Sequence, residues 1–397
     1  MKAGVSTFLD LSRWVAAFLV VINHARALVL ADFGALAQHS SADRAFYLVT
    51  GLGHEAVVIF FVISGFLVGG VTLDRWLMRG PDLRAYACAR TSRIYTTLVP
   101  ALVIGIVLDF TGLHWFDATR IYTTLPTPAI ASIATPFVTG MNVTAFFGNL
   151  FMLQGVLTPT LGSNGPLWSL SYEWWYYCLF ALAIAALTSE RAWRVGWVVA
   201  ALALVVALPL ALTLWGFVWM LGIIAHRWVY STVWRPAPAF GGALFAAALL
   251  ASRLTHGIAA IDASLAGSFT RDFVLGIAYM VALASASRLS HALPLAAMHR
   301  RLADFSYSTY LFHFPALLLL CAFACQTFGL RFSQPPDARG LVCFGVAVAL
   351  VYAYCFAASL LTERHTARVR HWLDAHLRAQ VQRQRSVEPA GAPAPKT

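Results

Sequence analysis

The run Glu55-Ala-Val-Val-Ile-Phe-Phe-Val-Ile-Ser-Gly-Phe-Leu-Val-Gly-Gly-Val-Thr-Leu73 decides the fold, because its nineteen residues carry one charge, at the first position. A helix of that length rises about 28 Å, close to the hydrocarbon thickness of a bilayer. The whole chain of 397 residues has the same character, with 59% hydrophobic and 11% charged residues. Soluble domains have about a quarter charged residues, so the composition excludes a soluble globular protein.

Nine further apolar runs accompany this one, and strands with alternating apolar residues do not occur. The sequence therefore predicts an all-α, polytopic membrane helical bundle with about ten transmembrane helices. The predicted spans are 14–31, 55–73, 94–113, 168–187, 195–212, 214–229, 237–251, 272–287, 306–329 and 339–361. Segment 143–158 is also apolar, but counting it as a span would place Arg191 and Arg194 outside. It is predicted to be re-entrant or interfacial.

Basic residues cluster in short links between these runs, which is the pattern that orients a membrane protein. The net charge of +11 is therefore assigned to topology, and no nucleic-acid partner is predicted. With both termini in the cytoplasm, the inner side carries 21 of the 28 basic residues. Residues 114–166 then form the longest outer segment. We expect a transmembrane domain over 1–363 and a basic cytoplasmic tail over 364–397, with a surface helix and a disordered part from 386.

Titratable residues inside membrane spans are candidates for function, because an unpaired charge in hydrocarbon is costly. Arg13 and His24 are eleven residues apart in the first span. Eleven steps of about 100° make three turns plus about 20°, so both side chains share one helix face, about 16 Å apart along the axis. A snorkelling arginine with a hydrogen-bonded core histidine is the alternative interpretation.

A second candidate pair, Arg90 and Arg93, stands at the cytoplasmic start of the third span. Residues at i and i+3 lie on one face, where two guanidinium groups can hold a phosphate in forked geometry. Ordinary membrane anchors of the positive-inside kind are the alternative.

A third group opens the fourth span in the segment 164–175. Ser169 and Glu173 are four residues apart and face the same way, beside Trp168 in an aromatic belt. Glu173 has no basic neighbour in sequence and needs a partner from another helix. Because the segment enters its span from the outer side, Glu173 is expected in the acceptor half of the cavity. His313, in a later span, is either a hydrogen-bonded core histidine or a catalytic one. Ser64-Gly65 gives the second span a notch for close helix packing.

Together these segments resemble membrane acyltransferase family 3, the integral-membrane O-acyltransferases of cell-surface glycans and related acceptors. The matching segments, in the expected order, are Asp10-Leu-Ser-Arg-Trp14 leading to Ile22-Asn-His24, Phe60-Phe61 with Ser64-Gly65-Phe66, Arg90-Thr-Ser-Arg93, Pro166-Leu-Trp-Ser-Leu-Ser-Tyr-Glu173, and Ser306-Tyr-Ser-Thr-Tyr-Leu-Phe-His-Phe-Pro315. Each motif is weak alone, but five in order are specific.

The resemblance implies acyl-CoA, acetyl-CoA first of all, as cytoplasmic co-substrate. It also implies a glycan or lipid-linked saccharide acceptor on the other side, and a bacterial inner membrane. The residues expected to act are His24 and Glu173 in catalysis, Arg13, Arg90 and Arg93 on the CoA phosphates, and Ser169, Trp168 and His313 on substrate. No metal is expected, because the six cysteines lack metal-site spacing.

Two questions stay open at this point. His24 is expected to act as general base on the acceptor hydroxyl, or alternatively to form an acyl-histidine intermediate. The rival function is a secondary transporter or flippase of a polar substrate, whose intramembrane charges would form a relay. That function predicts internal pseudo-symmetry, and the sequence shows no repeat strong enough to support it.

Overall fold

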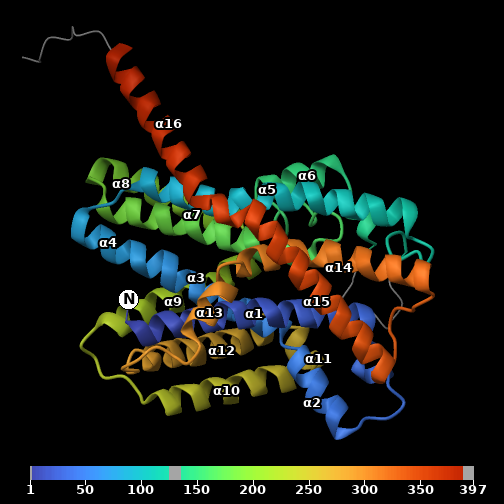
Figure 1. Ribbon diagram of the computed structural model, residues 1–397. Helices are drawn as coiled ribbons and strands as arrows, with labels where there is room; N and C mark the ends of the chain where they lie inside the picture. Colours follow the sequence, from blue (N-terminus) through green and yellow to red (C-terminus); the bar gives the residue numbers. More distant parts are fainter. Residues whose placement is uncertain (1, 125–135, 388–397) are drawn as a thin grey trace, which may run out of the picture.

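The computed structural model describes residues 2–124 and 136–387, and its long helices pack side by side as a bundle (Figure 1). Within these residues, nine helical segments are long and apolar enough to cross a membrane. This confirms the predicted polytopic helical bundle. The long helices are α1 (Ala3–Val29), α5 (Leu83–Trp115), α7 (Trp168–Thr188), α9 (Leu210–Tyr230), α10 (Pro238–Thr255), α12 (Leu265–Ala286), α14 (Ser306–Phe328) and α15 (Ala338–Leu361).

The ninth crossing segment is composite and contains the run that opens the sequence analysis. It comprises α2 (Ser41–Thr50), α3 (Gly53–Ser64), the π-helix η2 (Gly65–Gly70) and α4 (Val71–Arg79). The predicted notch is present: a Cβ on Gly65 would stand 1.8 Å from the carbonyl oxygen of Trp219 in α9. On α9, a Cβ at Gly222 would meet the backbone of η2 in the same way. Glycine on both sides therefore lets the two backbones touch.

The predicted span 195–212 differs from the structure. Its place is taken by α8 (Arg191–Ala207), which has 17 residues and a length of about 26 Å. Proline disfavours helical backbone in the residue before it. Leu208, which precedes Pro209, accordingly has extended geometry, and α9 begins after the proline. The sequence predicts a single helix over 195–212, whereas Pro209 divides these residues between α8 and α9.

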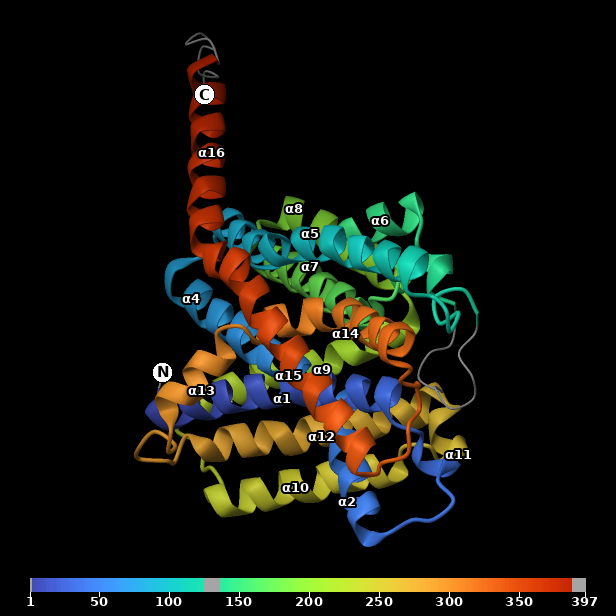
Figure 2. The same ribbon diagram turned by 45° about the vertical axis from the view of Figure 1, so that its right-hand side comes forward.

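Several short elements complete the chain: η1 (Phe33–Ala35), η4 (Phe137–Gly140), α6 (Val143–Leu150), η5 (Gly165–Leu167), α11 (Ala259–Asp262), α13 (Ala296–Ala303) and η6 (Glu363–His365). Helix α6 forms the first half of the apolar segment 143–158. Its eight residues are too few to cross a bilayer and lie against α5. The N-terminus and α13 lie toward one end of the bundle, and α2 and α11 toward the other (Figure 2).

The last described element is α16 (Thr366–Val387), which packs its first part on α5 and then projects from the bundle (Figures 1 and 2). A helix is therefore present in the basic stretch for which a surface helix is predicted, and its later part projects from the bundle. The tail predicted to be disordered lies, from residue 388 on, outside the described residues. The cytoplasmic placement of both termini stays a prediction from the charge distribution.

Candidate active site

Two cavities lie between the helices. The larger has a volume of about 1370 Å³ and contains seven arginines and four carboxylates in its lining. The smaller, of about 350 Å³, is lined in large part by residues 136–140 and 159–168, which belong to the predicted outer segment. Val57 and Tyr310 line both cavities. The two spaces are therefore neighbours that share part of one wall.

Helix α1 connects the two cavities. Arg13 lies in the wall of the larger cavity, where its guanidinium donates to the carbonyl oxygen of Ala303 (3.1 Å) and to Ser306 (3.4 Å). His24, three turns further along α1, lines the smaller cavity. The eleven-residue spacing thus places a cation at one cavity and an imidazole at the other.

His24 is bonded to the second histidine that the sequence singled out. Its Nδ1 lies 2.8 Å from Nε2 of His313, and the two rings stack. Nδ1 of His313 lies 3.0 Å and 2.9 Å from the carbonyl oxygens of Thr309 and Tyr310. Carbonyl oxygens only accept, so Nδ1 of His313 carries a hydrogen and its Nε2 accepts. Nδ1 of His24 then donates, and its Nε2 keeps a free lone pair.

His313 therefore fixes the orientation of the His24 ring through this hydrogen bond. The resemblance implies a contact of His313 with substrate, but the side chain of His313 is fully buried and belongs to the lining of neither cavity. The pairing joins residues 289 positions apart, and no sequence pattern within either helix shows it.

A proline in α14 fixes the loop that covers the smaller cavity. Pro315 has no N–H, so the carbonyl oxygen of Leu311 lacks its helical donor. The side chain of Asn164 donates to that oxygen at 2.9 Å. The next residue back, Ser163, donates from its backbone N–H and its hydroxyl to the buried carboxylate of Asp109, at 2.8 Å and 2.7 Å. The loop is thereby bonded to α14 and α5.

The start of α7 divides its residues between the cavities. Trp168 lines the smaller cavity, and Ser169 and Glu173 line the larger one. The hydroxyl groups of Ser169 and Tyr310 are 2.7 Å apart, so this bond closes part of the wall between the cavities. Tyr310 was not singled out from the sequence, although it lies within the matching segment 306–315.

Glu173 lies apart from His24. It accepts a hydrogen bond of 2.5 Å from the hydroxyl of Tyr177. Ser64 in turn donates to the oxygen of Tyr177 (3.1 Å) and accepts from the indole N–H of Trp219 (3.1 Å). From the sequence, Glu173 is expected in the acceptor half of the site. In the structure, Glu173 lines the larger, arginine-rich cavity.

Arg90 and Arg93 both line the larger cavity but have different partners. Nη1 of Arg93 lies 2.7 Å from the carboxylate of Glu363. Arg90 lies over the rings of Tyr86 and Tyr177, and its Nε has no hydrogen-bond partner among the described residues. Arg90 is therefore the member of the pair whose charge is available to an anion.

Glu363 is a residue that the sequence analysis missed. Besides Arg93, it accepts from the backbone N–H and the hydroxyl of Ser308, both at 2.9 Å, and so caps the start of α14. The available signal was a lone carboxylate directly after an apolar run. Further arginines of the larger cavity come from the segments around α13 and α16: Arg301, Arg364, Arg370 and Arg378.

Comparisons with known proteins show the family to which the chain belongs. A protein-family model described as an acyltransferase domain matches residues 6–360. One curated relative is an O-acetyl transferase of Shigella phage Sf6, 25% identical over 190 residues, which are 48% of this chain and 49% of the relative. Another is acyltransferase MdmB of Streptomyces mycarofaciens, 26% identical over 336 residues, 76% of each chain.

The chain thus spans about half the length of the phage relative and about three quarters of the other. No solved structure matches it. The family model covers all five segments on which the resemblance rests, and the resemblance is confirmed. By this match over nearly its whole length, together with its membrane-crossing helices, the chain belongs to the family of membrane acyltransferases.

Proposed function

We propose that this membrane O-acyltransferase moves an acyl group, acetyl first of all, from cytoplasmic acyl-CoA to a hydroxyl of a glycan or lipid-linked saccharide on the other side. A bacterial inner membrane is the proposed location. The observation that carries the proposal is the position of His24, which lines the smaller cavity and uses Nδ1 for its bond to His313, while the larger, arginine-rich cavity shares part of one wall with it.

The larger cavity supports acyl-CoA as donor by its charge. Seven arginines face four carboxylates there, an excess of three positive charges that favours a polyanion. Guanidinium groups bind phosphate through paired N–H donors. The nucleotide of CoA would then lie among Arg13, Arg90 and Arg93. The pantetheine arm is long and flexible, and would carry the thioester toward the wall at Tyr310.

The proposed chemistry uses His24 as general base. Its Nε2 takes the proton of the acceptor hydroxyl as that oxygen attacks the thioester carbonyl. The C–S bond then breaks, and the thiolate of CoA takes the proton back from Nε2. His313 holds the ring so that the lone pair stays on Nε2. The other route, in which Nε2 attacks first and an acyl-histidine then reacts with the acceptor, gives the same products.

Glu173 is proposed to bind the donor, which replaces the earlier expectation that it holds the acceptor. Its carboxylate can accept a hydrogen bond from an amide N–H of the pantetheine arm. Glu173→Gln should raise the KM for acetyl-CoA and for S-acetylpantetheine by the same factor, about three- to tenfold. Steady-state kinetics with both donors checks this. A raised acceptor KM with unchanged donor constants would return Glu173 to the acceptor side.

The proposed function is tested with the purified full chain in liposomes. Acetyl-CoA is supplied outside, and extracted lipid-linked saccharide is present in the membrane. We expect free CoA thiol to appear together with saccharide that is heavier by one acetyl group, in equal amounts. Liposomes without protein, or without saccharide, are the controls. Saccharide that crosses the bilayer unmodified, with no thiol released, would instead identify a flippase.

A further inference from the structure

A second histidine lines the smaller cavity from α3. His54 belongs to the same lining as His24 but comes from a different helix. Its Nε2 lies 2.7 Å from Oδ2 of Asp272 in α12. The side chain of His54 is 31% exposed, whereas Asp272 is fully buried. One partner of the pair is therefore within reach of a ligand and the other is not.

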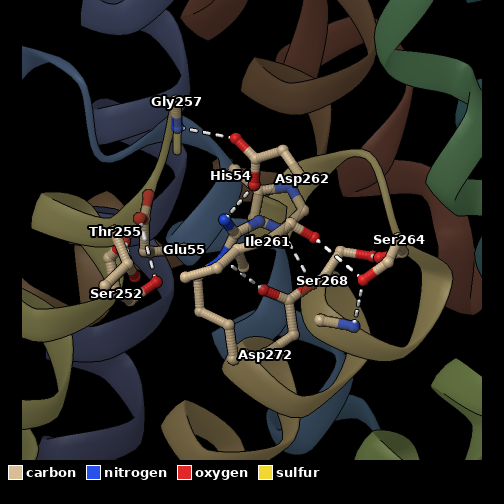
Figure 3. Close-up of polar contacts among 12 residues, drawn as sticks. His54, Glu55, Ser252, Thr255, Gly257, Ile261, Asp262, Ser264, Ser268 and Asp272 are labelled. Carbon is tan, nitrogen blue, oxygen red and sulfur yellow. Dashed lines mark hydrogen bonds and ion pairs between the residues drawn. The ribbon is translucent and has the colours of Figure 1, made fainter. Parts of the chain in front are cut away.

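The carboxylate of Asp272 is firmly positioned. The same oxygen accepts from the indole N–H of Trp215 at 2.9 Å, and Nε of the neighbouring Arg271 lies 3.6 Å from the other oxygen. Arg271 is itself paired with Asp262, which also accepts from the backbone N–H of Gly257 at 2.6 Å (Figure 3). An ionised carboxylate only accepts, so Nε2 of His54 donates to it, and in the neutral imidazole Nδ1 keeps the lone pair.

This pair sits beside a cavity whose size and lining suit a hydroxylated ligand. Ligand pockets measure about 300 to 1,000 Å³, and a volume of about 350 Å³ is at the lower end of that range. The space therefore suits one ring-sized unit. Thr139, Thr160 and Ser163 add polar groups to the lining.

We propose that His54, held by Asp272, binds the acceptor. Its Nδ1 accepts a hydrogen bond from a hydroxyl next to the one that His24 deprotonates. The acceptor unit would then carry two neighbouring hydroxyl groups, as a sugar ring does, and the two histidines select which hydroxyl reacts. This inference rests on the proposed acyl transfer and adds to it a residue that determines acceptor specificity.

Two replacements of His54 distinguish binding of the acceptor from a purely structural bond to Asp272. In His54→Gln the side-chain amide reaches the position of Nε2, so the bond to Asp272 is kept and the ligand-binding nitrogen is lost. In His54→Asn a polar atom remains near the position of Nδ1, and the bond to Asp272 is lost. His226→Asn is the matched control, because His226 also faces an aspartate, Asp74 at 3.4 Å, but lines neither cavity.

The full chain in detergent is assayed with acetyl-CoA and a panel of methyl glycosides. Hydrolysis of acetyl-CoA by water is measured separately, without a glycoside. We expect His54→Gln to raise the glycoside KM about tenfold, the equivalent of one hydrogen bond. Hydrolysis of acetyl-CoA and its KM should stay unchanged. His54→Asn should raise the glycoside KM less than His54→Gln does, and His226→Asn should leave it unchanged.

The outcomes distinguish this inference from the proposed function. If the wild type acylates a glycoside and His54→Gln has an unaltered glycoside KM while His54→Asn is impaired, His54 only supports Asp272, and the inference is wrong. An unaltered KM in both variants also overturns it. If the wild type acylates none of the glycosides, the saccharide acceptor of the proposed function fails, and the inference fails with it.

Discussion

Replacing His24 with alanine should lower acyl transfer at least about 100-fold, because a positioned general base contributes about 10² to 10⁴ in rate. Without Nε2 of His24, the reacting hydroxyl loses the lone pair that takes its proton. Binding of acyl-CoA should stay within about twofold of wild type, because His24 lines the smaller cavity and the arginines line the larger one. Turnover by thiol release and donor affinity by calorimetry measure the two effects.

His313 provides the matched control for this prediction. His313→Gln can offer an amide oxygen to Nδ1 of His24 and so preserve the bond now made at 2.8 Å. His313→Leu removes the acceptor and lets His24 adopt the other tautomer. We therefore expect the leucine variant to lose more turnover than the glutamine variant, with equal donor affinity. Activity of His24→Ala within a few-fold of wild type would rule out both the general base and the acyl-histidine.

The periodicity of single helices was sufficient to predict which site residues share a face of the same helix. Eleven residues return to one helix face, so Arg13 and His24 could be placed along one helix and at different depths from the sequence alone. The same reasoning put Ser169 and Glu173 on one face of α7, and both line the larger cavity. Such predictions succeed because they depend only on the helix that carries the residues.

Contacts between helices were beyond the sequence. His24 with His313, and Arg93 with Glu363, join residues far apart in the chain through helix packing. A helical pattern states which face is polar, but not which neighbour meets it. For this reason the sequence predicts Glu173 in the acceptor half, whereas its side chain lines the larger, arginine-rich cavity. The distance of a residue from a membrane surface does not state into which cavity its side chain points.

Replacing Arg90 should weaken donor binding more cleanly than replacing Arg93. Arg90→Gln removes a guanidinium that has no acidic partner within residues 2–124 and 136–387, and a charged hydrogen bond to phosphate is worth about 1.5 to 3 kcal/mol. We expect the Kd for acetyl-CoA to rise about 10- to 100-fold by calorimetry. Arg90→Lys should recover only part of this, because an ammonium group lacks the planar fork. The double variant, with both Arg90 and Arg93 replaced, should bind acetyl-CoA more weakly still.

Arg93→Gln has a second effect, because it leaves Glu363, whose side chain is only 5% exposed, without its cation. Glu363 caps α14, so this variant should also melt at a lower temperature, and Arg93→Gln with Glu363→Gln should regain part of that loss.

S-acetylpantetheine separates the loss of phosphate binding from the loss of stability, since it carries the thioester without the nucleotide phosphates. Arg90→Gln should use this donor as well as the wild type does. If the variant loses both donors equally, or binds acetyl-CoA with unchanged affinity, Arg90 does not hold the phosphates and serves as a topology anchor instead.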